Sequence, residues 1–278
     1  MQAASGGVDV DFFNEHGYLR LDARELLPQL GLLRAELSEL ISLRAQGIGA
    51  AHTPGVDHGF DDGLLALARM DRSHAGAVFD AASRLLSLHQ LSIHPWLIEI
   101  SKRIMGTDFV QCALDKALRM DFPGEERYLF PLHQDYTYDP SSPNGLVYWI
   151  PLRDVDEQSG CISYAGETHK AGIRDVLVRH KDTSEVTGNR LFDLADVSDV
   201  DRATMPLAEL HYGEVLVFSN LLIHASGANR SENVRWTVQV RHGDFRHPTA
   251  VSKGWPHGNF RGKWFYQTHP ERVREPEN

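Results

Sequence analysis

The stretch GEVLVFSNLLIHASGANRSENVRWTVQVRH, residues 213–242, decides the fold that we expect for this chain. It opens with an apolar run, passes through a cluster of Gly, Asn and Ser, and continues into VRWTVQVRH. Branched and aromatic residues favour strands, whereas Gly, Asn and Ser favour the turns between them. The stretch therefore predicts two strands joined by a long turn, with His224 at the end of the first strand.

Similar strand signals recur earlier in the chain. They are FVQCALDKALRM (109–120), GLVYWIPL (145–152) and GCISYA (160–165), and turn clusters such as DPSSPNG (139–145) separate them. Many short strands at this spacing indicate a sandwich or jelly roll rather than a parallel sheet. Neither GxGxxG nor GxxxxGK occurs in the sequence, which disfavours a nucleotide-binding fold.

The first hundred residues have a helical pattern instead. Residues 23–45 place leucines at helical spacing, and residues 74–90 and 93–105 also predict helices, with Pro95 in the first turn of the last. A glycine-rich linker, residues 47–63, separates the first helix from the second. We therefore expect a mainly β fold with α, in which a helical layer packs on a jelly roll.

We expect a single domain over residues 1–278. Its parts are a helical N-terminal portion (about 1–106), a jelly-roll core (about 107–245) and a C-terminal extension (about 246–278). Within the core, residues 171–212 are irregular and acidic, which predicts a solvated loop, and long inserts of this kind often cover a site.

Composition narrows the classes of partner. The formal net charge of −10 argues against nucleic acid or an anionic membrane as the main partner. No secretory signal or apolar run of membrane-spanning length is visible, and two cysteines cannot form a disulfide framework. We expect a cytoplasmic protein that acts on a small molecule; its oligomeric state is not readable from the sequence.

The segment PLHQDYTY, residues 131–138, places His133 and Asp135 two positions apart. On an extended segment such residues point to the same side, and Gln134 between them points away. His224 supplies a third candidate ligand, although only the fold can bring it near the first two. Two histidines and one carboxylate form the facial triad of non-haem Fe(II) oxygenases, which leaves positions open for a 2-oxo acid and O2.

A 2-oxoglutarate co-substrate also needs a cation for its far carboxylate. Arginine suits this role better than lysine because its planar fork binds a carboxylate with two hydrogen bonds. Arg235, on the strand that returns after His224, is the candidate, and Arg230 and Arg241 are its rivals.

Three motifs taken together resemble the phytanoyl-CoA dioxygenase family of Fe(II)/2-oxoglutarate oxygenases. They are HQD (133–135), WIPLRDVDEQSGCISYAGETHK (149–170) and IHASGANRSENVRW (223–236). The resemblance implies a cupin-like double-stranded β-helix core. One departure is that the family usually has Pro-Gly before Ser/Thr-His-Lys, where this chain has Gly166 and Glu167.

The resemblance also implies roles for individual residues. His133, Asp135 and His224 would bind iron, and Arg235 would bind the distal carboxylate of 2-oxoglutarate. By motif position, three further residues are expected near the cofactor: Trp149, which can equally be a core indole, Gln134 and Ser226. Related halogenases replace the carboxylate ligand with a small residue, so Asp135 favours hydroxylation.

The expected activity is hydroxylation of an unactivated C–H bond of a small-molecule metabolite, with release of succinate and CO2. Candidate substrate contacts are Tyr136, Tyr138, Lys116 and Arg119, each of which can instead be a packing or surface residue. The alternatives are a non-catalytic jelly-roll binding protein, an oxygenase of acyl-CoA thioesters and a zinc hydrolase. The last is disfavoured because the sequence has no HExxH motif.

Overall fold

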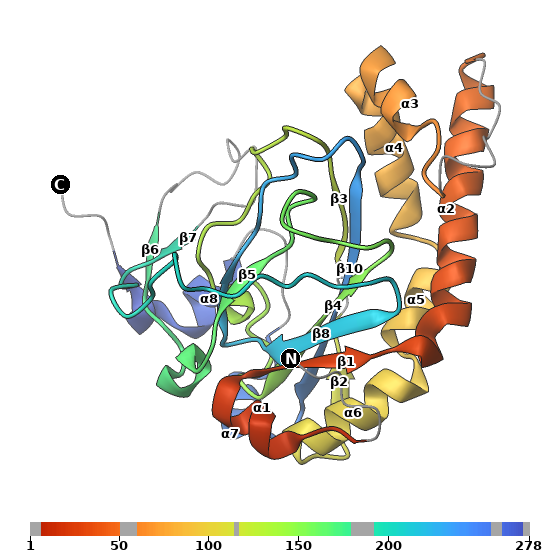
Figure 1. The fold of residues 1–278 in the computed structure, drawn as a ribbon. Helices are drawn as coiled ribbons and strands as arrows, with labels where there is room; N and C mark the ends of the chain where they lie inside the picture. The colour runs from red at the N-terminus through yellow and green to blue at the C-terminus, as the bar shows by residue number, and fades with distance from the viewer. Residues whose placement is uncertain (1–6, 51–59, 114–116, 179–191, 257–262, 275–278) are drawn as a thin grey trace.

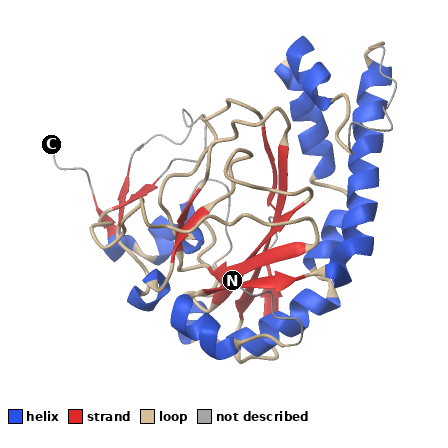
Figure 2. Cartoon of the chain, in the orientation of Figure 1, coloured by secondary structure: helices blue, strands red, loops and turns tan. Residues whose placement is uncertain are grey.

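A computed structural model of the chain places a helical layer against one face of a large antiparallel sheet (Figures 1 and 2). The structure describes residues 7–50, 60–113, 117–178, 192–256 and 263–274. Among these residues, no helix combines the length and apolar character needed to cross a bilayer.

The helices of this layer begin and end where the local sequence dictates. They are α1 (Val10–His16), α2 (Leu27–Gly47), α3 (Leu64–Met70), α4 (Arg72–Ala82), α5 (Leu86–Ser92) and α6 (Pro95–Met105). In α6, His94 caps the first turn, Pro95 occupies the first helical position and Gly106 ends the helix in the left-handed conformation. The single helix predicted over 74–90 is wrong in detail, because the chain turns between α4 and α5.

The main sheet is antiparallel throughout. Its strands are β1 (Tyr18–Asp22), β8 (Glu214–Ser219), β4 (Gly145–Pro151), β10 (Arg235–Asp244) and β2 (Val110–Cys112) in spatial order, with β3 (Ala117–Asp121) also paired to β10. The N-terminal portion therefore contributes one edge strand, β1, as well as helices.

A smaller layer faces the main sheet. It contains β5 (Ser163–Ala165) paired with β9 (Ile223–Ala225), together with single bridges such as His133 to His224. Apolar residues of both layers meet between them: Val147, Trp149, Leu216 and Phe218 from the main sheet, and Cys161, Ile162, Tyr164 and Leu222 from the opposite side. Two facing antiparallel layers make the jelly roll that the strand pattern predicts.

Strand β10 separates two environments. Trp236, Val238 and Val240 enter the core shared with the helices. Because side chains alternate along a strand, Arg235 and Arg241 point to the other face, into the space between the two layers. Strand β10 thus contributes two arginines to the inner face of the jelly roll.

The acidic insert is partly regular. It forms β6 (Val176–Val178) and β7 (Phe192–Leu194), and β6 pairs in parallel with β11 (Val273–Arg274) near the C-terminal end. Two more helices, α7 (Pro248–Ser252) and α8 (Lys263–Thr268), lie in the C-terminal extension. The insert is therefore connected to the last part of the chain by main-chain pairing.

Candidate metal centre

His133 and His224 lie directly opposite each other on two antiparallel segments. The backbone N of each donates to the carbonyl of the other, at 3.0 and 3.1 Å. Directly opposed residues in an antiparallel pair project their side chains to the same side. The two imidazole rings accordingly lie with centroids 4.1 Å apart, although the histidines are far apart along the chain.

Both imidazoles are oriented by the main chain. His133 Nδ1 lies 2.8 Å from the Pro131 carbonyl, and His224 Nδ1 lies 3.0 Å from the Leu222 carbonyl. A carbonyl oxygen only accepts, so Nδ1 carries a proton in each ring, and in the neutral imidazole Nε2 keeps its lone pair. Metal-binding histidines are typically held in this way by a bond from the other ring nitrogen.

Asp135 completes the cluster. It starts a short 3₁₀ turn (Asp135–Thr137), and its Oδ1 lies 3.3 Å from His133 Nε2 and 3.6 Å from His224 Nε2. One ligand atom from each residue falls within 4.8 Å of the others, and all three residues are buried. Three ligands at right angles, each about 2.1 Å from a metal, would be about 3 Å apart, close to the two observed separations.

The electrostatics keep this donor set ready for a cation. Burial would raise the pKa of Asp135, but the Arg241 guanidinium and the two imidazoles outweigh it and hold that pKa well below its usual range. Burial, together with the neighbouring His133, lowers the pKa of His224 to about 3. The cluster therefore contains a carboxylate and a neutral imidazole at neutral pH.

Arg241 holds the carboxylate oxygen that faces away from the imidazoles. Its Nε and Nη2 lie 3.0 and 2.9 Å from Asp135 Oδ2, and Nη2 also donates to Gln239 Oε1 at 2.8 Å. From the sequence, Arg241 is an alternative to Arg235 for binding 2-oxoglutarate. In the structure it pairs instead with Asp135, the aspartate of the cluster.

Arg235 has unused hydrogen-bonding capacity. It is 1% exposed, and its Nη2 lies 2.7 Å from Asp121 Oδ2 on the neighbouring strand β3. Its Nε and Nη1 are buried and have no hydrogen-bond partner among the residues that the structure describes, and the same holds for the hydroxyl of Thr237 two residues further along the same face. Buried donors without partners are costly, so this site fits an anion that would accept from them.

Asp121 joins two arginines. Arg119 donates to it through Nη2 to Oδ1 at 2.6 Å and through Nε at 3.2 Å to Oδ2, the oxygen that Arg235 also contacts. Burial would raise the pKa of Asp121, but the two guanidinium groups lower it to about 2. Arg119, an expected substrate contact, also donates to the Tyr128 carbonyl at 3.0 Å.

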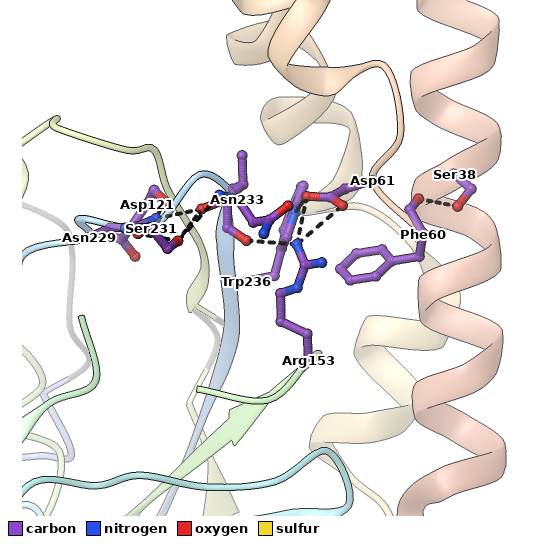
Figure 3. Close-up of polar contacts among 10 residues, drawn as sticks. Ser38, Phe60, Asp61, Asp121, Arg153, Asn229, Ser231, Asn233 and Trp236 are labelled. Atoms are coloured by element: carbon purple, nitrogen blue, oxygen red, sulfur yellow. Dashed lines mark hydrogen bonds and ion pairs between the residues drawn. The ribbon is translucent and has the colours of Figure 1, made fainter. Parts of the chain in front are cut away.

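The end of β10 that carries Arg235 is held by side chains from the helical side and from the turn before the strand (Figure 3). Trp236 Nε1 donates to Asp61 Oδ2 at 3.1 Å, and Arg153 Nη1 lies 3.4 Å from Asp61 Oδ1. Asn229 Nδ2 donates to the Asp121 carbonyl at 2.9 Å. Neither Asp61 nor Asp121 carries a sequence signal of its own, because Trp236 and Arg235, which they bind, are distant along the chain.

The remaining expected cofactor neighbours have different surroundings. Trp149 is fully buried and lies opposite Gln239 in the pairing of β4 with β10. Ser226 Oγ accepts from the Phe130 N–H at 3.1 Å. The side chain of Gln134 donates to two carbonyls, of Gly172 and Leu221, and accepts from the Arg174 N–H, so it connects loops.

The two expected substrate tyrosines diverge. Tyr138 lies near the cluster, with its ring centroid 5.7 Å from that of His133, and Phe130 stacks on the same imidazole at 4.9 Å. Tyr136 instead points toward the C-terminal extension, where its hydroxyl lies 2.8 Å from His269 Nε2. Lys116 falls outside the described residues.

Known proteins resemble this chain in sequence. A family profile described as Phytanoyl-CoA dioxygenase (PhyH) matches residues 13–237. A probable phytanoyl-CoA dioxygenase of Caenorhabditis elegans is 25% identical over 156 residues, 54% of this chain and 48% of that protein. The peroxisomal phytanoyl-CoA dioxygenase of Homo sapiens is 28% identical over 119 residues, 41% of this chain and 33% of the human protein. The chain therefore matches a third to a half of the length of these relatives.

Solved structures resemble it in fold. The non-heme alpha ketoglutarate dependent carbocyclase SnoK from nogalamycin biosynthesis has a TM-score of 0.54 at 21% identity, over 87% of this chain and 86% of that one. The apo non-heme monooxygenase ThoJ has a TM-score of 0.55 at 15% identity, over 95% and 99%. These similarities confirm the jelly-roll fold class.

Proposed function

This chain belongs to the phytanoyl-CoA dioxygenase family, and we propose that it is an Fe(II)- and 2-oxoglutarate-dependent dioxygenase. The proposed reaction is hydroxylation of an unactivated C–H bond of a small-molecule metabolite, with release of succinate and CO2. The observation that carries the proposal is the meeting of two Nε2 atoms and one carboxylate oxygen within 4.8 Å, inside a jelly roll.

The donor set fits ferrous iron. Two imidazoles and one carboxylate, with further positions left open, are typical of non-haem Fe(II) oxygenases, and His133, Asp135 and His224 would be the ligands. When bound, the iron would supply the oxidising chemistry with O2. The protein would fix the orientation of the ligands. The Pro131 and Leu222 carbonyls, which accept from Nδ1 of His133 and His224, would orient both imidazoles before any metal binds.

The inner face of β10 fits 2-oxoglutarate. Arg235 would bind the distal carboxylate through the two guanidinium nitrogens that have no partner within the described ranges, and the Thr237 hydroxyl would add a third donor. Asp121 holds the remaining guanidinium nitrogen, Nη2, at 2.7 Å. The buried indole of Trp149 would wall the same space and exclude water.

The substrate side is less restricted. Tyr138 and Phe130 surround the His133 imidazole with aromatic surface, which suits an apolar part of a metabolite next to the metal. Arg119 lies on the same inner face but is already bound by Asp121. A small metabolite remains our proposal over an acyl-CoA thioester, and the cytoplasm remains the proposed compartment.

The test is anaerobic addition of Fe(II) and 2-oxoglutarate to the purified protein, followed by absorption spectroscopy. We expect a visible charge-transfer band in the wild type. Loss of charge-assisted hydrogen bonds worth about 1.5–3 kcal/mol should weaken 2-oxoglutarate binding about 10- to 100-fold in Arg235→Ala. The matched control is Arg230→Ala, because Arg230 lies exposed in the preceding turn and should leave the band unchanged.

Turnover gives a second readout. Asp135→Ala removes the only acidic member of the cluster and should abolish succinate formation from 2-oxoglutarate. A wild type that shows no band and binds ligands without metal would favour the non-catalytic binding protein. Product mass distinguishes hydroxylation, which adds one oxygen atom, from other outcomes at the same carbon.

A further inference from the structure

We propose that Arg241 is a positioning residue that keeps Asp135 as a one-oxygen ligand and so preserves the metal positions that 2-oxoglutarate needs. This inference rests on the proposed function and deepens it. It concerns a residue that donates to the carboxylate of Asp135 and to Gln239, and to which the proposed function gives no role.

The two oxygens of Asp135 have different surroundings. Oδ1 faces the Nε2 atoms of both histidines, at 3.3 and 3.6 Å. Oδ2 faces Arg241, whose Nε and Nη2 lie at 3.0 and 2.9 Å. One oxygen of the carboxylate, Oδ1, therefore faces the two imidazoles, while the other, Oδ2, accepts from two nitrogens of Arg241. These two donors on Oδ2 orient the carboxylate.

Arg241 is itself held firmly. It lies within β10, which pairs with β4 so that Arg241 is opposite Val147. Its Nη2 also donates to Gln239 Oε1 at 2.8 Å, two residues back on the same face of the strand. Its side chain is 16% exposed, so little room remains for the guanidinium to swing away from the carboxylate.

This arrangement matters for the number of open metal positions. Three protein ligands on one face would leave about three metal positions, of which 2-oxoglutarate would need two and O2 one. A carboxylate with a free second oxygen can chelate a cation through both oxygens. If Oδ2 of Asp135 were released, it could occupy a position that the co-substrate requires.

The prediction is a split between two affinities. In Arg241→Met, the released oxygen adds to the metal site, so the affinity for the metal alone should be equal to or higher than in the wild type. The affinity of the Fe(II) form for 2-oxoglutarate should fall by about 10-fold or more, about 1.4 kcal/mol, because the released oxygen would compete for one of the positions that 2-oxoglutarate requires. Arg241→Lys keeps the charge but offers one nitrogen in place of two. Its 2-oxoglutarate affinity should lie between the affinities of the wild type and of Arg241→Met.

The experiment measures Co(II) binding to the metal-free protein by calorimetry, and 2-oxoglutarate binding to the anaerobic Fe(II) protein from the charge-transfer band. Arg246→Met is the matched control, because Arg246 is 59% exposed and pairs with Asp108 away from the cluster. It should leave both affinities unchanged. Thermal unfolding of each metal-free variant establishes that it is folded, and Arg241→Lys carries the test if Arg241→Met is not.

Three results would overturn the inference. One is an unchanged 2-oxoglutarate affinity in a folded Arg241 variant whose wild-type parent gives the band. Another is a parallel loss of Co(II) and 2-oxoglutarate affinity, which would make Arg241 a general stabiliser of the site. A wild type without any band would overturn the proposed function first, so the two failures are distinguishable.

Discussion

At the scale of single residues, the centre depends on atoms whose partners are fixed before a ligand arrives. The Nδ1 protons of His133 and His224 are both bound by carbonyls two residues earlier in the chain. Arg235, by contrast, keeps two buried nitrogens that no group in the described part of the chain contacts through a hydrogen bond. The first feature lowers the cost of organising a metal site, and the second leaves free energy to be gained when an anion binds.

Another residue-scale feature lies at the departure from the family motif. Glu167 has φ 67°, a left-handed conformation that costs a residue with a side chain about 1–2 kcal/mol and glycine much less. Its neighbour Gly166 is not in that conformation. The chain thus places glutamate where the backbone of the turn favours glycine.

We predict that Glu167→Gly stabilises the protein by up to about 1 kcal/mol, because relief of the left-handed strain exceeds the added freedom of the unfolded chain. Urea unfolding measures the change. Glu167→Gln separates the backbone effect from the exposed ion pair with Lys170, and should be nearly neutral. A destabilised Glu167→Gly would show that the side-chain contacts of Glu167 outweigh the strain.

At the scale of elements, the register of β3 against β10 determines the pairing of charges. Asp121 is opposite Arg235 in that register, and Arg119 is opposite Thr237. The inner face of the sheet thus carries one acid between two arginines. Because the pair is buried, its free energy depends on both partners being present and ionised.

We predict that Asp121→Asn is strongly destabilising at neutral pH, by about 3 kcal/mol, since it leaves two arginines without their shared counter-ion. The pKa of Asp121 is lowered by folding from 3.8 to about 2, so its ionisation stabilises the fold above about pH 4. That part, about 2 kcal/mol, is lost as the pH falls through 2. The gap in unfolding free energy between wild type and variant should therefore narrow toward acid pH, and a gap independent of pH would contradict this account.

At the scale of the whole molecule, the insert and the C-terminal extension form one cluster beside the metal centre. Its buried members are Leu132, Tyr136, Val176, Val178, Phe192, Leu194, Ile223, Ala225 and Phe265. Several of these residues adjoin the metal cluster in sequence: Leu132 precedes His133, Tyr136 follows Asp135, and Ile223 and Ala225 flank His224. Packing far from the sheet thus supports the backbone that carries all three proposed ligands.

We predict that Phe265→Ala lowers the free energy of unfolding by about 3 kcal/mol, because Phe265 is fully buried and its loss leaves a cavity. It should also weaken Co(II) binding, since Tyr136 would lose its packing next to Asp135. Urea unfolding and calorimetry measure the two effects. Leu86→Ala, at a residue 74% exposed, is the control and should change stability by less than about 0.5 kcal/mol. Unchanged metal affinity in Phe265→Ala would mean that the cluster does not support the centre.

Much of the fold could be predicted because its signals are local. The alternation in VRWTVQVRH predicts a strand with one apolar and one polar face, and the structure confirms that strand as β10. The break between α4 and α5 was missed because Arg84 and Leu85 are good helix formers, and only packing of both short helices against α2 determines the turn. The short strands of the insert were missed because β6 finds its parallel partner, β11, almost a hundred residues later.

By itself the sequence determined the kinds of side chain available: two histidines, a nearby aspartate and two arginines on the same face of one strand. The tertiary structure decided which arginine meets which acid. Alternation along a strand fixes the face on which a side chain lies, but its partner depends on the register with strands that come from elsewhere in the chain. Arg235 thus lies opposite Asp121 while Arg241 reaches Asp135, because β10 pairs with β3 and β4 in one particular register. No local signal in the sequence encodes that register.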